Sequence, residues 1–114
     1  MPRRAAGLTA AKARTAKPGR YGDGDGLYLL VRGPEARFWL FRYTLHGRMR
    51  EMGLGTAYGA GAVTLAGARE QVGELRRMLR ADNDPLDARK RAEEQRAAAA
   101  AAKIGIAVFS HLGA

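Results

Sequence analysis

The middle of the chain, between residues 27 and 54, is rich in apolar and aromatic residues. They fall into three runs, 27–32, 38–45 and 48–54, which are separated by the turn-forming residues Gly33-Pro34-Glu35 and His46-Gly47. Short runs of Leu, Val, Tyr, Phe and Trp between turn residues are typical of β-strands. The pattern therefore predicts a three-stranded antiparallel meander.

The two-residue turn at His46-Gly47 fixes the register of the second hairpin. It places Leu45 opposite Arg48, so that Tyr43 faces Arg50, Phe41 faces Met52 and Trp39 faces Leu54. Side chains of one parity then collect on a single face, which we predict to be the core. This set is Leu27, Leu29, Val31, Trp39, Phe41, Tyr43, Met52 and Leu54.

The other parity of the same strands mixes stacking, apolar and basic side chains. It consists of Tyr28, Leu30, Arg32, Phe38, Leu40, Arg42, Thr44, Met49 and Glu51. Such a face is too apolar to be an ordinary solvated surface, which predicts that it meets a partner.

A helix is predicted after the sheet, because residues Leu65 to Leu79 keep apolar positions at helical spacing behind Thr64 as N-cap. Asp82 to Pro85 ends it, with Asn83 as the expected left-handed residue. Residues 86–103 have high helix propensity without an apolar stripe, which predicts an exposed helical linker. We interpret the remaining residues to 114 as the end of a truncated or frame-shifted gene product, and the alternative is a short strand or helix that covers the sheet's outer face.

These elements predict an α+β fold, β-β-β-α, in which a three-stranded antiparallel sheet packs on one helix. Residues 1–22 form a basic N-terminal arm, residues 23–85 the folded domain, and residues 86–114 the helical linker and tail. The turn Asp23-Gly-Asp-Gly26 is expected to bend the arm onto the first strand.

The net charge of +9 is concentrated in the arm, where residues 1–22 hold six basic groups and no acidic one. This asymmetry indicates an anionic polymer as partner, with nucleic acid first and an anionic membrane surface second. Arginine outnumbers lysine, which favours bidentate phosphate or guanine contacts. A GC-rich genome is an equally sufficient explanation of the arginine content.

Several classes of function are disfavoured by composition. The chain has no cysteine, so disulfides, thiolate nucleophiles and zinc knuckles are excluded. Its acidic turn lacks the further ligands of a calcium loop, and we expect no metal, cofactor or small-molecule substrate. No apolar run is long enough to span a bilayer and no secretory signal is present, which favours a cytoplasmic bacterial protein. The acid-free N-terminus also imitates a mitochondrial transit peptide.

Three ordered motifs carry a resemblance to a known family. They are Asp23-Gly-Asp-Gly-Leu-Tyr-Leu-Leu-Val31, then Trp39-Leu-Phe-Arg-Tyr43, then Gly47-Arg-Met-Arg-Glu-Met-Gly-Leu-Gly55. Together with Leu8-Thr9, Ala16 to Gly19, Leu65 to Arg69 and Asp84-Pro85, this set resembles the arm-type DNA-binding domain of phage and genomic-island integrases, which are tyrosine recombinases. The resemblance covers roughly residues 8 to 90 and disfavours the transit-peptide interpretation.

The resemblance implies that the sheet lies in the major groove of duplex DNA while the helix packs behind it. Arg42, beside Tyr28 and Thr44, is then the leading candidate for a base contact, with Arg32 next. Glu51 lies opposite Arg42 in the predicted register, so a cross-strand ion pair is the structural alternative.

Two further groups of basic residues are candidates for contacts with the DNA backbone. Strand ends and loops carry Arg37, His46, Arg48 and Arg50, and the arm carries Lys12, Arg14, Lys17 and Arg20. The arm residues are expected to follow the phosphates or to enter the minor groove.

No catalysis is expected from this polypeptide. Tyrosine recombinases mark their active site with His-x-x-Arg ahead of the tyrosine nucleophile, whereas His46 is followed by Met49 and His111 by Ala114. We therefore interpret the chain as an integrase truncated before its core-binding and catalytic domains, which acts on nucleoid DNA. Integrase subunits are a further candidate partner.

Two alternatives remain open at this point. Trp39, Phe41 and Tyr43 resemble the stacking platform of sheet-based RNA binders, although their alternation predicts that they are core. The apolar outer face is alternatively a protein–protein surface.

Overall fold

The computed structural model describes the backbone of residues 7–113 and the side chains of residues 7–103. The chain divides into two compact units, the first ending at Asp82 and the second beginning at Asn83. The elements of the first unit are, in chain order, α1 (Ala10–Thr15), β1 (Gly19–Gly24), β2 (Leu27–Gly33), β3 (Ala36–Leu45), β4 (Arg48–Thr56) and α2 (Leu65–Arg80).

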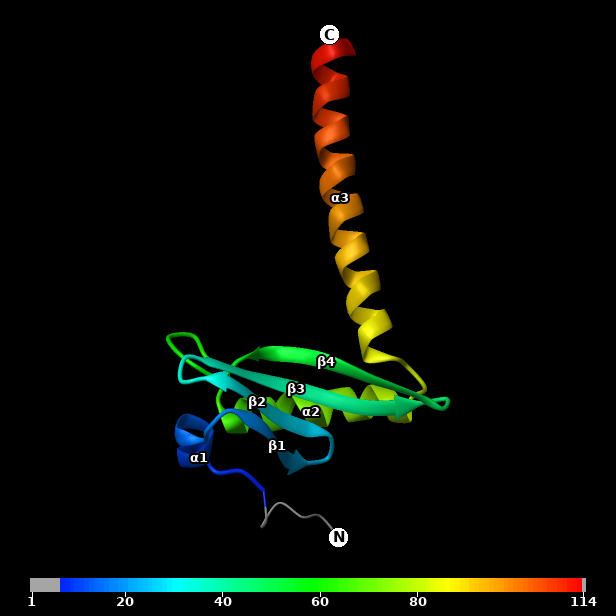
Figure 1. The fold of residues 1–114 in the computed structure, drawn as a ribbon. Helices are drawn as coiled ribbons and strands as arrows, with labels where there is room; N and C mark the ends of the chain where they lie inside the picture. Colours follow the sequence, from blue (N-terminus) through cyan, green and yellow to red (C-terminus); the bar gives the residue numbers. More distant parts are fainter. Residues whose placement is uncertain (1–6, 114) are drawn as a thin grey trace. The chain divides into compact units, whose positions relative to one another are not determined.

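The four strands form one antiparallel sheet in the order β1-β2-β3-β4 (Figure 1). Helix α2 packs against β2 and β3, so that one face of the sheet is covered by a helix. The predicted α+β class is confirmed. The predicted number of three strands is wrong.

The additional strand β1 comes from the segment that the sequence assigned to the basic arm. It pairs with β2 from Gly19 opposite Val31 to Gly24 opposite Leu27. Between them, Asp25 and Gly26 have φ values of 57° and 89°, as in a type I′ hairpin turn. The glycine-rich segment lacks apolar alternation, so its pairing depends on backbone hydrogen bonds to the edge of β2.

The rest of the predicted arm is also ordered from residue 7 onward. Thr9 caps α1 by accepting a hydrogen bond from the Lys12 N–H at 3.1 Å. Residues 1–6 of the predicted arm lie outside the described residues.

The β3–β4 register agrees with the prediction from the turn to the middle of the strands. Leu45 pairs with Arg48, and Tyr43 and Phe41 face Arg50 and Met52. Beyond a bulge, however, Trp39 lies opposite Gly55 and not Leu54, because β4 contains one extra residue between the partners of Leu40 and Trp39.

The core lies between α2 and the sheet. All eight predicted core side chains are buried, together with Leu65, Ala68 and Val72 of α2 and with Leu8, Ala13 and Ala16 in and around α1. Trp39 is 1% exposed and its indole N–H donates to the Val63 carbonyl at 2.7 Å. The rings of Phe41 and Tyr43 stack with centroids 5.3 Å apart. The prediction that these three aromatic residues are core is confirmed.

Helix α2 begins where the sequence predicted. The Thr64 hydroxyl accepts from the Gly67 N–H at 3.0 Å, which confirms it as the N-cap. The helix ends at Arg80 and the left-handed residue is Asp82, with φ of 64°, not Asn83. The turn therefore closes one residue earlier than expected.

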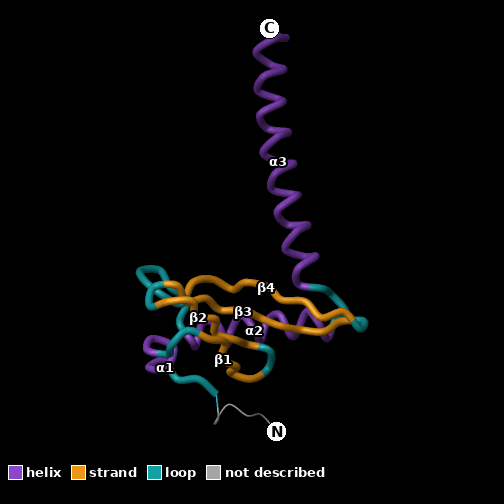
Figure 2. The backbone as a smooth tube through the Cα atoms, viewed as in Figure 1, coloured by secondary structure: helices purple, strands orange, loops and turns teal. Residues whose placement is uncertain are grey.

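The second unit contains one continuous helix, α3 (Pro85–Gly113) (Figure 2). The predicted linker at 86–103 is helical and mostly exposed, as its composition indicated. The same helix runs on through the tail, so a strand there is excluded. The side chains of residues 104–114 lie outside the described ones.

Candidate nucleic-acid interface

The sheet face opposite α2 carries the second parity of side chains and is called the open face below. It consists of Arg20, Tyr28, Leu30, Arg32, Phe38, Leu40, Arg42, Thr44, Met49 and Glu51. Phe38 and Met49 are 38% and 60% exposed, although apolar side chains of this size are usually buried. The open face therefore combines exposed apolar groups with arginines.

Two guanidinium groups approach one aromatic ring at the centre of the open face. The Cζ atoms of Arg20 and Arg42 lie 5.5 and 5.8 Å from the centroid of the Tyr28 ring. Distances below about 6 Å are within the range of cation–π attraction. Tyr28 thus holds two arginines that come from β1 and β3.

Glu51 bridges the same two arginines from β4. Its Oε2 lies 2.6 Å from Arg20 Nη1 and 3.3 Å from Arg42 Nε. Hydrogen bonding to Arg20 holds the pKa of the Glu51 carboxyl below its usual value, and the same bond raises the pKa of Arg20. The cross-strand pair between Arg42 and Glu51, which the register predicted as the alternative to a base contact, is present.

Five of the sequence-predicted site residues meet on the open face. Arg42, Arg32, Tyr28 and Thr44 lie there as their alternation predicted. Arg20 joins them from β1 and was expected in a separate arm. The sequence missed this because it did not predict β1 as a strand.

Lys12, Arg14 and Lys17 do not lie on the open face. The first two belong to α1, and Lys12 Nζ lies 5.3 Å from the ring of Tyr21. Tyr21 alternates with Arg20 along β1, so its side chain is on the α2 side of the sheet. The Lys17 carbonyl accepts a hydrogen bond from the Tyr21 hydroxyl at 2.6 Å.

The β3–β4 hairpin carries three more of the predicted residues. His46 Nε2 lies 2.8 Å from Asp82 Oδ1, just beyond the end of α2. Arg48 and Arg50 have the same parity as Met52, which directs them toward the α2 side of β4, although Arg48 is exposed at the strand end.

Arg37 requires a correction. It is only 6% exposed, and its guanidinium donates to the carbonyls of Pro34 at 2.9 Å and Ala13 at 3.1 Å. A buried guanidinium whose donors bind backbone carbonyls ties α1 to β3. The expectation that Arg37 reaches phosphates does not fit this position.

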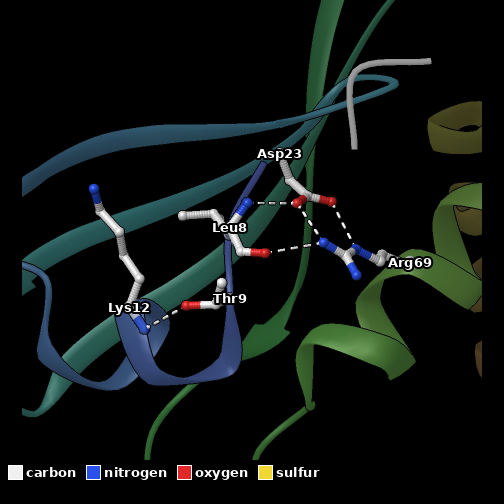
Figure 3. A network of polar contacts seen from close by, with 5 residues as sticks. All are labelled: Leu8, Thr9, Lys12, Asp23 and Arg69. Atoms are coloured by element: carbon white, nitrogen blue, oxygen red, sulfur yellow. Dashed lines mark hydrogen bonds and ion pairs between the residues drawn. The ribbon is translucent and has the colours of Figure 1, made fainter. Parts of the chain in front are cut away.

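One network that supports the open face was not anticipated as such. Asp23, at the end of β1, is buried and its carboxylate accepts from Arg69 of α2 and from the Leu8 N–H (Figure 3). In the sequence, Asp23 was interpreted as a turn residue and Arg69 only as part of a motif. The available signal for this ion pair was an acidic residue, Asp23, in a glycine-rich segment, together with an arginine, Arg69, beside the core-facing positions of the predicted helix.

With this geometry established, the chain can be compared with known proteins. The family model described as an arm DNA-binding domain matches residues 8–92. The chain belongs to this family. A comparison with curated proteins finds no match. The arm DNA-binding domain is a non-catalytic module, and DNA is the partner that its family indicates.

The match extends over every element of the first unit, and its beginning at Leu8 coincides with the start of the Asp23 network. Within the described residues of this arm DNA-binding domain, no three His, Asp or Glu side chains gather to hold a metal ion. None of its described helices is long and apolar enough to cross a membrane.

Proposed function

We propose that this arm DNA-binding domain binds duplex DNA by placing its open face in the major groove. The observation that carries the proposal is the position of Arg42, which is exposed on the inner strand β3 and lies over the ring of Tyr28. The major groove admits a two-stranded ribbon, and arginine binds guanine O6 and N7 in a bidentate manner. Thr44 lies two residues further along the same face, and its hydroxyl can form a hydrogen bond with a donor or an acceptor on a base edge.

Residues around the sheet supply the phosphate contacts in this proposal. Lys12, Arg14 and Lys17 lie at the N-terminal side and Arg48 at the β3–β4 hairpin, all exposed. Phosphate contacts fix affinity and position but carry little sequence information. If about six form, the logarithm of the binding constant falls with the logarithm of salt concentration with a slope near −5.

The biological role that fits this binding is recognition of arm-type sites by a site-specific integrase during DNA integration or recombination. Family membership supports it. In this role the domain itself breaks no bond, positions the recombinase on nucleoid DNA and meets other integrase subunits there.

The decisive experiment is fluorescence anisotropy with labelled duplexes taken from the flanks of an attachment locus, beside scrambled duplex and single-stranded RNA. The flanking duplex is expected to bind best at every salt concentration. Arg42→Ala is expected to lose about 5- to 150-fold in affinity for it, as for one bidentate base contact. Arg80→Ala, which removes an exposed arginine from α2, serves as the control. Equal binding by the two variants would refute the proposal.

A protein-binding role is the second candidate, because Phe38 and Met49 are exposed on the open face. Binding of an apolar protein surface would persist at high salt and would not require DNA. The RNA-binding alternative loses its basis, since the buried Trp39, Phe41 and Tyr43 offer no stacking platform.

A further inference from the structure

Glu51, on the edge strand β4, lies on the face that is proposed to meet a polyanion. Among the described residues of the open face it is the one acidic group, and it lies between Arg20 and Arg42. Three ionised groups in contact give a local charge of +1, where the two arginines alone would give +2. A carboxylate here weakens general attraction to phosphates, so its position calls for another explanation.

Glu51 contacts different atoms of the two arginines. Arg20 uses both terminal nitrogens, with Nη1 at 2.6 Å from Oε2 and Nη2 at 3.4 Å from Oε1. For Arg42 the closest contact is at Nε, which lies 3.3 Å from the same Oε2. Glu51 thus holds Arg20 by its terminal nitrogens and Arg42 on its Nε side.

This arrangement orients Arg42 before any ligand arrives. Its guanidinium is held at one edge by Glu51 and over one face by Tyr28. With Glu51 at its Nε side, Arg42 can offer the fork of Nη1 and Nη2 to the neutral acceptors O6 and N7 of guanine. Arg20 acts as the clamp that fixes the Glu51 carboxylate.

The same carboxylate discriminates against phosphate. Arg42 is itself in contact with Glu51. A phosphate oxygen bound to Arg42 would therefore bring a second negative charge close to the Glu51 carboxylate, and the two negative charges would repel each other. Guanine carries no formal charge and avoids this repulsion. The repulsion from Glu51 therefore weakens non-specific binding to DNA phosphates more than it weakens the recognition of a guanine base.

We propose that Glu51 is a positioning residue that sets the specificity of the open face, presenting Arg42 to a guanine edge while disfavouring phosphate contacts. This inference rests on the proposed DNA-binding function and adds the ligand class of its central arginine, a guanine edge in the major groove.

The test compares Glu51→Gln with Glu70→Gln, which removes the same charge from the exposed surface of α2. The probes are a random pool of labelled 20-base-pair duplexes and a duplex selected from that pool by the wild-type protein, in anisotropy titrations over a series of salt concentrations. Glutamine keeps the size of Glu51, and circular dichroism establishes that both variants are folded.

Glu51→Gln is expected to bind the random pool several-fold more tightly than the wild type, with a salt slope steeper by about 0.9 for each phosphate gained. Its preference for the selected duplex over the pool is expected to fall, whereas Glu70→Gln keeps the wild-type preference. A 7-deazaguanine substitution in the selected duplex is expected to weaken the wild type more than Glu51→Gln.

Two failures of this test have different meanings. If wild-type protein binds no duplex, or selects none from the pool, the proposed function itself is wrong. If the wild type selects a duplex but Glu51→Gln keeps the same preference and salt slope as Glu70→Gln, the specificity role of Glu51 is refuted and DNA binding stands.

Discussion

Asp23 and Arg69 form a bidentate ion pair that joins the edge strand β1 to helix α2. Arg69 Nη2 lies 2.7 Å from Asp23 Oδ1, and Arg69 Nε lies 2.9 Å from Oδ2. Leu8 closes the network, because its N–H donates to Oδ1 at 2.8 Å and its carbonyl accepts from Arg69 at 3.0 Å. Hydrogen bonding to Asp23 raises the pKa of Arg69. This pair fixes β1, and through β1 the position of Arg20 on the open face.

Arg69→Met is expected to destabilise the domain, because it leaves the fully buried Asp23 carboxylate without its charged partner. We expect a loss of about 2 to 3 kcal/mol in the free energy of unfolding, below the usual value for a buried pair since the Arg69 side chain is 32% exposed. Urea denaturation followed by circular dichroism measures it. Arg80→Met is the matched control on the same helix, and an equal effect of both would show that the pair does not stabilise β1.

Trp39→Ala is expected to cost about 3 to 5 kcal/mol, because it removes a fully buried side chain and its hydrogen bond to Val63. The neighbouring Phe38 points to the open face and is 38% exposed, so Phe38→Ala should cost far less. Thermal unfolding of the two variants compares the faces directly. A Phe38→Ala protein less stable than Trp39→Ala would mean that the sheet is turned the other way.

Gly26→Ala is expected to destabilise the β1–β2 hairpin. Gly26 has φ of 89°, its carbonyl accepts from the Arg42 N–H at 2.8 Å, and an added Cβ would collide with the Arg42 carbonyl. We expect a loss of at least about 1 to 3 kcal/mol, as for strained backbone positions. Gly73→Ala, at an exposed position of α2 with open space around it, should instead stabilise by about 0.8 to 1 kcal/mol. The same sign of change for both would contradict the close approach at Gly26.

Runs of β-forming residues between turns were sufficient to predict β2, β3 and β4, and the register set by the turn was sufficient to predict their core residues. Trp39, Phe41 and Tyr43 share one parity, and only one parity of a sheet can be buried against a single helix. The turn at His46-Gly47 then fixed most of the β3–β4 register. The bulge that pairs Trp39 with Gly55 could not be predicted in the same way. The segment Gly53-Leu54-Gly55 is compatible with Trp39 opposite either Leu54 or Gly55.

Strand β1 was not predicted, because the run of β-forming residues that marks the other strands is absent from its sequence. Gly19 to Gly24 has glycines where other strands have apolar side chains, so its stability comes from backbone pairing and from the Asp23–Arg69 contact. A contact between residues 46 positions apart is not visible in local periodicity. For the same reason the sequence analysis assigned Arg20 to an arm. It also predicted Arg37 at the surface, whereas Arg37 is buried and donates hydrogen bonds to the carbonyls of Pro34 and Ala13.

The stability of the domain is expected to respond to Glu51 at acid pH. The folded-state pKa of Glu51 is lowered, mainly by hydrogen bonding to Arg20, so its contribution is complete above its unfolded pKa of about 4.3. That contribution is lost as pH falls through the lower folded value. Among the described residues, the charged groups paired with Glu51 are Arg20 and Arg42.

Urea unfolding of wild type and Glu51→Gln from pH 7 to pH 3 tests this dependence. The difference between the two free energies is expected to be constant above about pH 5 and to shrink below about pH 4.3. The effect is small because the pair is partly exposed. A difference that grows on acidification would mean that the Glu51 carboxylate is not stabilised by its arginines.

Lys17→Ala is expected to weaken binding to all duplexes by a similar factor, since Lys17 is exposed beside the sheet and does not belong to the open face. A lost phosphate contact reduces the salt slope by about 0.9 and leaves the ratio between selected and scrambled duplex unchanged. Arg42→Ala should do the opposite, lowering that ratio with little change in slope. Anisotropy titrations of both variants over a range of salt concentrations separate the two effects. If Lys17→Ala lowered the ratio as much as Arg42→Ala, sequence recognition would extend beyond the open face and the division of roles proposed here would be wrong.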